Sequence, residues 1–191
     1  MSYTSPVQKF KERNLFSRLK KKDQDAFVQA YDLYVDDIHR FVYFKVGNKE
    51  EANDLTSIIF LKTWDYIKSN SLKDSRTLRA LLYKIARTTI IDYYRQSRPH
   101  VSLDDEEKKI DVIDENQDVM SQISINSDLE LIRKKLPELK IEYREVLIMR
   151  FVNDLSLEEI SEITGKSKGN TRVLVFRALK ALRELIEDNN N

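Results

Sequence analysis

The sequence predicts an all-α protein with two small helical domains joined by a flexible acidic linker. Only three Gly and three Pro occur among the 191 residues, so residues that break helices are rare. Between Pro6 and Pro99, apolar residues recur three and four positions apart, which is the period of an amphipathic helix. No segment alternates polar and apolar residues for long enough to predict a β-strand.

The first predicted domain, residues 1–98, contains four helices. Their expected ranges are residues 9–21, 23–46, 49–68 and 76–97. Gly47-Asn48 separates the second helix from the third, since Gly readily adopts the left-handed conformation that ends a helix. The polar segment 69–75 separates the third helix from the fourth.

The predicted linker, residues 99–127, stands out by its charge. Residues 101–128 hold two basic and nine acidic residues, a net −7, whereas residues 1–100 carry +7 and residues 129–191 carry +1. The total of +1 therefore hides three segments of different charge. Because the linker has few apolar residues it cannot form a core. We expect either a passive spacer or a segment attracted to a cationic surface of a partner.

The second predicted domain, residues 128–191, begins with a capping-box spacing at Ser127-Asp128-Leu129-Glu130. Its first helix is expected to stop before Pro137, to restart around Glu138 and to run to about Val152.

The rest of this domain predicts a helix-turn-helix. Ser156-Leu157-Glu158-Glu159 is another capping box, and the short helix that it begins is expected to end at Gly165. Ser167 can cap a final helix that runs to about Glu187. A Gly turn between a short and a longer helix is typical of this motif.

The final helix has a basic outer face. Residues 165–183 contain six basic residues and no acidic one. A turn of about 100° per residue separates an inward apolar stripe from this outer arc, which suits a DNA major groove. The alternative is a helical hairpin whose charges are only solvated. The predicted DNA contacts are Lys168, Asn170, Arg172, Val173, Phe176, Arg177 and Lys180.

A second candidate surface interleaves tyrosine and arginine on the helix at residues 76–97. Aromatic rings stack on unpaired bases while guanidinium groups neutralise phosphates, so this pattern suits single-stranded nucleic acid. The alternative is ordinary packing of the rings. The predicted contacts are Arg76, Arg79, Tyr83, Arg87, Tyr94, Arg95 and Arg98.

Composition argues against several other classes of protein. The chain has no Cys and only two His, which disfavours a thiol nucleophile and a histidine-rich or cysteine-ligated metal site. We find no phosphate-binding GxxxxGK[ST] loop. No catalytic residue, cofactor or metal is expected. No apolar run reaches the roughly 18 residues that span a bilayer, and residues 1–10 lack a signal-peptide core. We expect a cytoplasmic protein.

Four motifs, in this order, resemble bacterial RNA polymerase sigma factors of the extracytoplasmic-function class. The first two are Ala52-Asn53-Asp54-Leu55 with Phe60, and Leu82-Tyr83-Lys84-Ile85-Ala86-Arg87 with Asp92-Tyr93-Tyr94-Arg95. The third and fourth are Leu136-Pro137 with Arg144-Glu145-Val146-Leu147, and Glu159-Ile160 with Gly165, Gly169, Arg177-Ala178 and Leu182.

The resemblance implies a dissociable polymerase subunit rather than an enzyme. Its first domain would bind core polymerase and melt the promoter's minus-ten element, and residues 69–75 match the loop that captures a flipped base. Its second domain would read the minus-thirty-five element. An anti-sigma protein is a possible further partner. Matched positions assign polymerase contacts to Asp54, Leu55, Ser57 and Phe60.

Two other functions remain open from the residues alone. A polymerase-independent transcription regulator could use the same helix-turn-helix, but it would leave the tyrosine-arginine helix without a role. A helical protein-binding adaptor would have no affinity for DNA in any context.

Overall fold

The structure, a computed structural model, describes residues 14–70, 72, 77–97 and 134–187. Every regular element within these ranges is helical, as the periodicity predicts. The predicted linker at 99–127 and the predicted capping box at 127–130 lie outside the described residues.

Three long helices form the first domain: α2 (Gln24–Val46), α3 (Lys49–Ser69) and α4 (Thr77–Ser97). Of the helix predicted at 9–21, residues 14–20 are described and helical. The Asp23 carboxylate caps α2 by accepting from the Ala26 amide at 3.2 Å. Gly47, with a φ of 79°, ends α2 as predicted, and Asn48 caps α3.

The three helices pack against one another around a common core. Its fully buried side chains come from all three: Ile38, Phe41, Val42, Ile59, Ile67, Leu82, Ala86 and Ile90. Burying such apolar groups stabilises the fold by roughly 1.5–3 kcal/mol for each large side chain.

Aromatic rings join α2 to α3 near one end of this domain. The ring of Trp64, the only tryptophan in the sequence, lies 4.8 Å from that of Phe27 between centroids. Tyr31 and Phe60 pack edge to face at 4.7 Å. These contacts contribute about 0.5–1.5 kcal/mol for each ring pair beyond the area buried.

In the described part of the second domain, residues 134 and 135 are α-helical and lead into a short 3-10 turn, η2 (Leu136–Glu138), which is followed by α6 (Ile141–Leu147). The prediction that the helix restarts around Glu138 is wrong by three residues. Leu139 is extended, with a ψ of 154°, so helical geometry resumes only after Lys140. The helix then widens into a π-helix, η3 (Ile148–Val152), and ends at the predicted residue.

Two further helices complete this domain: α7 (Leu157–Thr164) and α8 (Lys168–Glu187). The helices α7 and α8 pack against each other, and α8 also packs against α6. Their shared core includes Val146, Leu147, Ile148, Met149, Leu155, Ile160, Ile163, Val175 and Ala178.

A buried arginine stabilises the turn that leads into α6. The Arg144 guanidinium donates to the Leu136 carbonyl at 3.0 Å and also to the Pro137 carbonyl. Burial lowers the pKa of this guanidinium from its ordinary value. The Leu136 carbonyl also accepts from the Leu139 amide at 3.2 Å, so the guanidinium adds side-chain bonds to the backbone bond that closes the turn.

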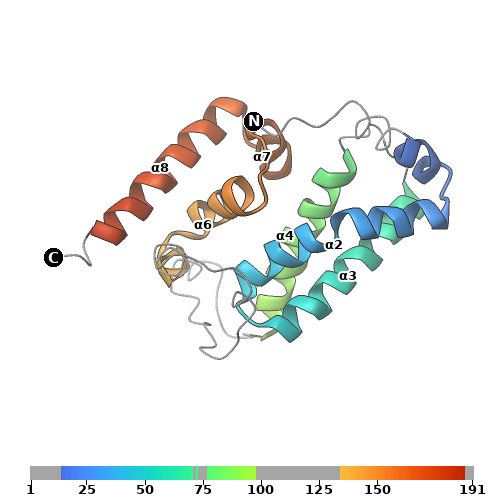
Figure 1. Cartoon of the computed structure of the whole chain (residues 1–191), viewed down its shortest axis with the longest axis horizontal. Coiled ribbons are helices and arrows are strands. Elements are labelled where there is room, and N and C mark those ends of the chain that lie inside the picture. Colours follow the sequence, from blue (N-terminus) through green and yellow to red (C-terminus); the bar gives the residue numbers. More distant parts are fainter. Residues whose placement is uncertain (1–13, 71, 73–76, 98–133, 188–191) are drawn as a thin grey trace.

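The two domains contact each other, which the sequence did not predict. Figure 1 shows α6 lying between α8 and the group formed by α2, α3 and α4. Contacts run from α4 to α7 and from α2 to η3. One side of α4 therefore faces the second domain rather than solvent.

Candidate nucleic-acid interfaces

The predicted helix-turn-helix is formed by α7, the turn at Gly165 and α8. Ser156 and Glu159 make a reciprocal capping box: the Glu159 amide donates to Ser156 Oγ at 3.2 Å, and the Ser156 amide donates to Glu159 Oε2 at 2.8 Å. Gly165 has a φ of 70°, which favours glycine. Ser167 Oγ accepts from the Asn170 amide at 3.2 Å. Both predicted caps and the predicted turn are confirmed.

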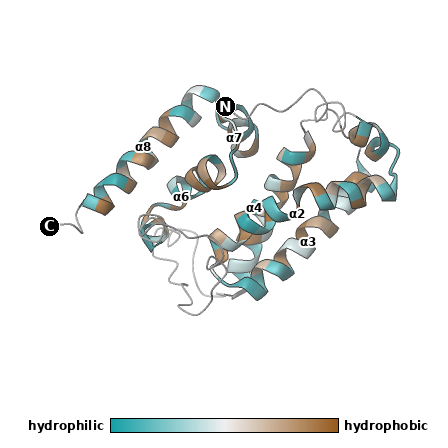
Figure 2. Cartoon of the chain, in the orientation of Figure 1, coloured by the Kyte–Doolittle hydropathy of each residue, from teal (hydrophilic) through white to brown (hydrophobic). Residues whose placement is uncertain are grey.

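The inner face of α8 is apolar and holds the helix on its domain. Thr171, Val175 and Ala178 are buried along this face, and Leu174 and Leu182 pack at its margins. Figure 2 shows hydrophobic residues alternating with hydrophilic ones along α8. The period matches one buried and one free face.

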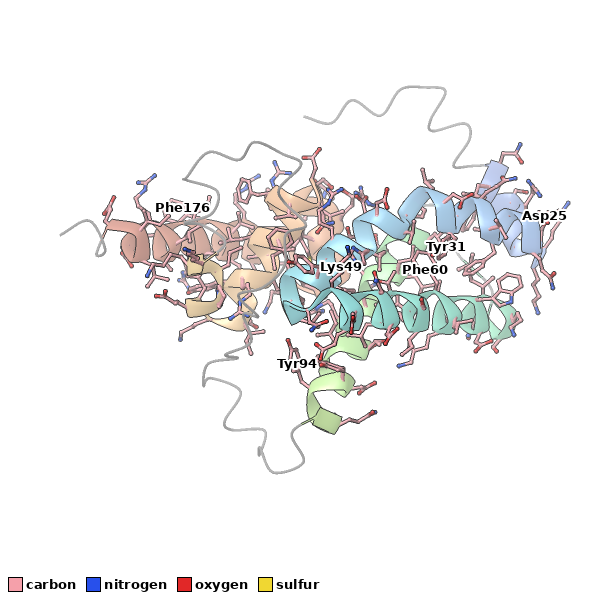
Figure 3. All side chains as sticks on the ribbon, turned by 60° about the horizontal axis from the view of Figure 1, so that its bottom comes forward. Asp25, Tyr31, Lys49, Phe60, Tyr94 and Phe176 are labelled. Atoms are coloured by element: carbon pink, nitrogen blue, oxygen red, sulfur yellow. The ribbon has the colours of Figure 1, made fainter. Side chains whose placement is uncertain are left out.

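All seven DNA contacts that were predicted for the final helix lie on the exposed side of α8. They are Lys168, Asn170, Arg172, Val173, Phe176, Arg177 and Lys180. Val173 is 47% exposed and Phe176 is 68% exposed. Figure 3 shows Phe176 near one end of the molecule, and Tyr31 and Phe60 lie toward the other end. The structure thus brings these residues onto one accessible helix face.

Two ion pairs on this face are weak enough to exchange for phosphates. Lys168 Nζ lies 3.3 Å from Glu158 Oε1, and Lys180 Nζ lies 3.6 Å from Glu184 Oε1. All four side chains are at least 60% exposed. Exposed pairs of this kind contribute at most about 1 kcal/mol. Both lysines therefore remain available to another anionic partner.

Arg79, one of the predicted contacts on α4, is engaged by both domains. Its Nη1 lies 2.9 Å from Glu159 Oε1 of α7, and its Nη2 lies 3.2 Å from Asp37 Oδ2 of α2. Nη2 also donates to the Asn153 carbonyl at 3.2 Å. Burial by itself lowers the pKa of Arg79, but Glu159, Asp37 and the neighbouring Tyr83 outweigh it and raise the pKa.

Arg87, about two helical turns further along α4, is engaged by the second domain. Its Nη2 lies 2.9 Å from Glu145 Oε2, and Lys45 Nζ lies 2.6 Å from Glu145 Oε1. Burial raises the pKa of the Glu145 carboxyl, but Lys45 and Arg87 together outweigh burial and hold the pKa below its ordinary value. Glu145 therefore stays ionised between two cations.

The expectation that Tyr83 lies on an exposed arc of α4 is wrong. The side chain is 1% exposed, and its ring packs edge to face against Phe41 at 5.1 Å. Burial raises the pKa of its hydroxyl far above the ordinary range. A turn of about 100° per residue places Tyr83 opposite the apolar stripe of α4, but this helical-wheel argument fails because α2 and the second domain cover that side of the helix. Tyr83 is a core residue in this structure.

The end of α4 is more accessible. Tyr94 is half-buried, and its hydroxyl donates to the Lys45 carbonyl at 2.7 Å. Arg95 is exposed. Arg76 and Arg98 lie outside the described residues, so their predicted roles remain predictions. Figure 3 shows Tyr94 on a part of α4 that extends away from α2 and α3.

The four predicted polymerase contacts on α3 divide between its two faces. Asp54 and Ser57 are exposed, whereas Leu55 and Phe60 are 5% and 3% exposed and belong to the core. The exposed face of α3 that carries Asp54 and Ser57 also carries two apolar residues. Ile58 is 41% exposed and Leu61 is 65% exposed.

Sequence reasoning missed Ile58 and Leu61, although a signal was present. In the run Ile58-Ile59-Phe60-Leu61, four consecutive apolar residues cannot all face one core from a single helix. Two of them had to point outward. Positions 54, 57, 58 and 61 form one helical face.

Comparison with known families places two matches on this architecture. Residues 30–99 match the Sigma-70 region 2 family, and residues 129–182 match the Sigma-70 region 4 family. The first match covers most of α2 and all of α3 and α4, and the second ends within α8.

Individual relatives match the chain along most of its length. The ECF RNA polymerase sigma factor SigW of Bacillus subtilis is 31% identical over 178 residues, which cover 90% of this chain and 94% of that protein. The chain belongs to the ECF family of RNA polymerase sigma factors. This sigma factor is also 30% identical to BldN of Streptomyces coelicolor over 91% of its own length and 65% of BldN.

A solved structure shares the fold of this sigma factor. It is that of RpoE from Bartonella quintana, crystallised with the anti-sigma factor NepR. The TM-score is 0.67 at 24% sequence identity, and the match covers 84% of this chain and 96% of that one.

The described part of this sigma factor contains neither a membrane-spanning helix nor a cluster of metal ligands. None of its described helices is both long and apolar enough to span a membrane. Across residues 14–70, 72, 77–97 and 134–187, no three His, Asp or Glu side chains cluster as metal ligands. Sigma factors are non-enzymatic transcription initiation factors.

Proposed function

We propose that this sigma factor directs core RNA polymerase to promoters by reading the minus-thirty-five element with α8 and melting the minus-ten element with α4. The observation that carries the proposal is the accessible face of α8, where basic and apolar side chains follow a capped helix-turn-helix. The chain acts as a dissociable cytoplasmic subunit and not as an enzyme, with no cofactor.

On α8, residues near the N-terminus contact bases, and residues further along the helix contact the phosphate backbone. Arg172 is close to the N-terminus, where a recognition helix reaches base edges in the major groove. Guanidinium groups bind guanine O6 and N7 in bidentate fashion, whereas Val173 and Phe176 can contact thymine methyl groups. Lys180, two turns further along, binds the phosphate backbone and positions the helix.

On α4, the cations and one ring suit the melted strand. Arg79, Arg87 and Arg95 supply positive charge for phosphates along the helix, and Tyr94 supplies a surface for base stacking. Tyr83 is left out of this role because its ring is buried against Phe41.

Core polymerase binds α3 through the arc of Asp54, Ser57, Ile58 and Leu61. Exposed apolar residues flanked by polar ones are typical of protein interfaces. Leu55 and Phe60 support that arc from the core side of the helix. The partners are therefore core polymerase and promoter DNA, both double-stranded and melted.

An anti-sigma factor is a further proposed partner. RpoE, which shares the fold, was crystallised with NepR. A protein that covers α3 or the accessible face of α8 would block polymerase or promoter binding.

Transcription in vitro tests the proposal. Core polymerase with and without this chain is presented with a promoter library, and initiation is expected only when both proteins are present. Substituting Leu61→Ser, which changes an exposed side chain, should weaken core binding. Val28→Ser is the matched control, because Val28 is 57% exposed but lies on α2. This substitution should leave core binding unchanged.

A polymerase-independent regulator is the alternative that this experiment also tests. Tight sequence-specific binding by the chain alone, together with no binding to core, would overturn the proposal in favour of that regulator. No binding to DNA in either setting would favour an adaptor.

A further inference from the structure

The ionic contacts between the two domains converge on groups that the proposed function assigns to DNA. Glu159 pairs with Arg79 at 2.9 Å, and Glu145 pairs with Arg87 at 2.9 Å. Arg79 and Arg87 come from α4, and both carboxylates come from the second domain. Their separations in sequence are 80 and 58 residues, so neither pair follows from local structure.

Backbone carbonyls of the second domain complete the coordination of the same cations. Arg87 Nη1 donates to the Ile163 carbonyl at 3.2 Å, and Arg79 Nη2 donates to the Asn153 carbonyl at 3.2 Å. Arg40, on α2, donates to the Val152 carbonyl at 3.2 Å. The second domain thus presents a set of oxygen acceptors to the cationic side of the first.

Carboxylate and carbonyl oxygens of the second domain accept hydrogen bonds from the N–H groups of Arg79 and Arg87. Phosphate oxygens would bind the same N–H groups. A guanidinium group has five N–H donors in a fixed plane and binds carboxylate and phosphate with the same geometry. A nucleic-acid backbone at Arg79 and Arg87 would compete with Glu159 and Glu145 for the same N–H donors. DNA binding at α4 therefore opposes contact between the domains.

Lys45 strengthens the contact without belonging to the proposed DNA face. Its ammonium lies 2.6 Å from Glu145, and the two side chains are 12% and 7% exposed. A charge pair this buried is costly to break on one side only, because the remaining charge is left unpaired. Lys45 and Glu145 together form the most buried ionic contact of the interface.

The same interface contains groups that oppose closure. Arg79 Nε, Arg87 Nε and Asn153 Oδ1 are buried and have no hydrogen-bond partner among the described residues. Unpaired buried polar atoms destabilise the state that contains them. Contact between the domains is therefore stabilised by ion pairs and weakened by unpaired polar atoms, as expected for a contact that opens.

We propose that this structure is a closed, self-masked state, in which carboxylates of the second domain occupy the minus-ten face of α4 until the domains separate. The ion pair between Lys45 and Glu145 latches this state. Nucleic acid and the second domain compete for Arg79 and Arg87. This inference rests on the proposed function, because it assigns those arginines to DNA.

Spin labels measure the separation of the domains directly. The chain has no Cys, so Asp65→Cys on α3 and Glu162→Cys on α7, both exposed, provide two unique attachment points. Pulsed electron resonance then gives the distance distribution between them in the full-length chain. A single narrow distance distribution is expected for the parent, and longer, broader distributions for Glu145→Gln and Lys45→Met.

Glu142→Gln is the matched control. Glu142 is on the same helix as Glu145 but pairs with Lys166 inside its own domain, at 3.3 Å. The substitution removes an equal charge without touching the interface, so the distance distribution of the parent should persist. If Glu145→Gln fails to fold, Lys45→Met tests the latch from the first domain.

Binding of a fluorescein-labelled single-stranded oligonucleotide of mixed sequence, at fixed salt, tests the masking. Both Glu145→Gln and Lys45→Met should bind at least about fivefold more tightly than the parent. Lys45→Met discriminates best, because removing a positive charge would by itself weaken binding to DNA. Glu142→Gln should bind as the parent does.

Each failure points to a different step. Unchanged distances in both latch variants would overturn the closed state. Longer distances without tighter oligonucleotide binding would overturn the masking. If Arg95→Ala then still reduces promoter opening by the polymerase holoenzyme, the proposed function stands without self-masking. If Arg95→Ala has no effect there, the assignment of α4 to DNA fails instead.

Discussion

The hydroxyl of Tyr94 donates a hydrogen bond to the carbonyl of Lys45 at 2.7 Å, which joins the end of α4 to the end of α2. The last four carbonyls of a helix have no partner within it, and Lys45 provides one of these in α2. The phenol therefore satisfies a main-chain group, while its half-buried ring packs edge to face against Tyr93 at 5.3 Å.

Substituting Tyr94 in two ways should separate these two roles. Tyr94→Phe removes only the hydrogen bond and should lower the free energy of unfolding by about 0.5–1.5 kcal/mol, measured by urea denaturation. Tyr94→Ala also removes the ring and should reduce promoter opening by about 1–3 kcal/mol where a base stacks on it. Permanganate reactivity of the melted strand measures the opening.

If the two folded variants open promoters equally, the ring is only packing. The Tyr83→Phe substitution is a control on the same helix. Its hydroxyl is buried and has no hydrogen-bond partner in the described part of the chain, so its loss should leave opening unchanged.

Two glycines in the helix-turn-helix should respond oppositely to alanine. Gly165 has a φ of 70°, so Gly165→Ala places a side chain in the left-handed region and should destabilise by about 1–2 kcal/mol. Gly169 lies in the first turn of α8, and a Cβ there meets no atom within 4 Å. Gly169→Ala should be neutral or stabilise by up to about 1 kcal/mol.

Thermal unfolding of both variants checks this pair. Equal effects of the same sign would mean that the turn does not depend on the left-handed conformation. Since neither substitution meets a steric obstacle, the difference between them isolates backbone conformation.

Arg172→Ala should lower transcription from a promoter that depends on its minus-thirty-five element. The expected loss is about 1–3 kcal/mol if the guanidinium reads a guanine. Arg183→Ala is the control, because this exposed arginine is on the same helix but lies outside the predicted contacts. Equal losses in the two variants would indicate a general electrostatic effect rather than base recognition.

The ionisation of Glu145 predicts how the interface responds to acid. Its folded-state pKa is held below the ordinary value of about 4.3, so its stabilising effect is present above that value and is lost as the pH falls through the folded pKa. The difference in unfolding free energy between the parent and Glu145→Gln should be constant from about pH 6 to 8 and should shrink below about pH 4. A difference that grows on acidification would contradict this sign.

Local signals in the sequence predicted most of the helices and both caps of the helix-turn-helix. Ser156 with Glu159, Gly165 and Ser167 each act on residues within four positions, so spacing alone identified them. Exposure on α8 was predicted for the same reason: one face packs on its own domain and the other faces solvent. The predicted start of α6 was misplaced because Leu139 adopts an extended conformation, which no local sequence pattern indicated.

Long-range contacts could not be predicted in this way. The helical-wheel argument assumes one buried and one solvated face, yet α4 is covered by α2 on one side and by the second domain on another. Tyr83 and Arg79 were therefore both assigned to solvent, although the first is buried and the second pairs with Glu159. The interface depends on residues 80 positions apart, and no periodicity records such a pairing.

The position of Trp64 makes it possible to measure whether the two domains unfold together. As the only tryptophan, packed against Phe27 in the first domain, it reports by fluorescence on that domain alone, whereas circular dichroism reports on helices of both. Coincident melting curves from the two probes are the mark of a single all-or-none transition. With the latch intact the two domains should melt as one thermodynamic unit, and with Glu145→Gln the curves should separate into two.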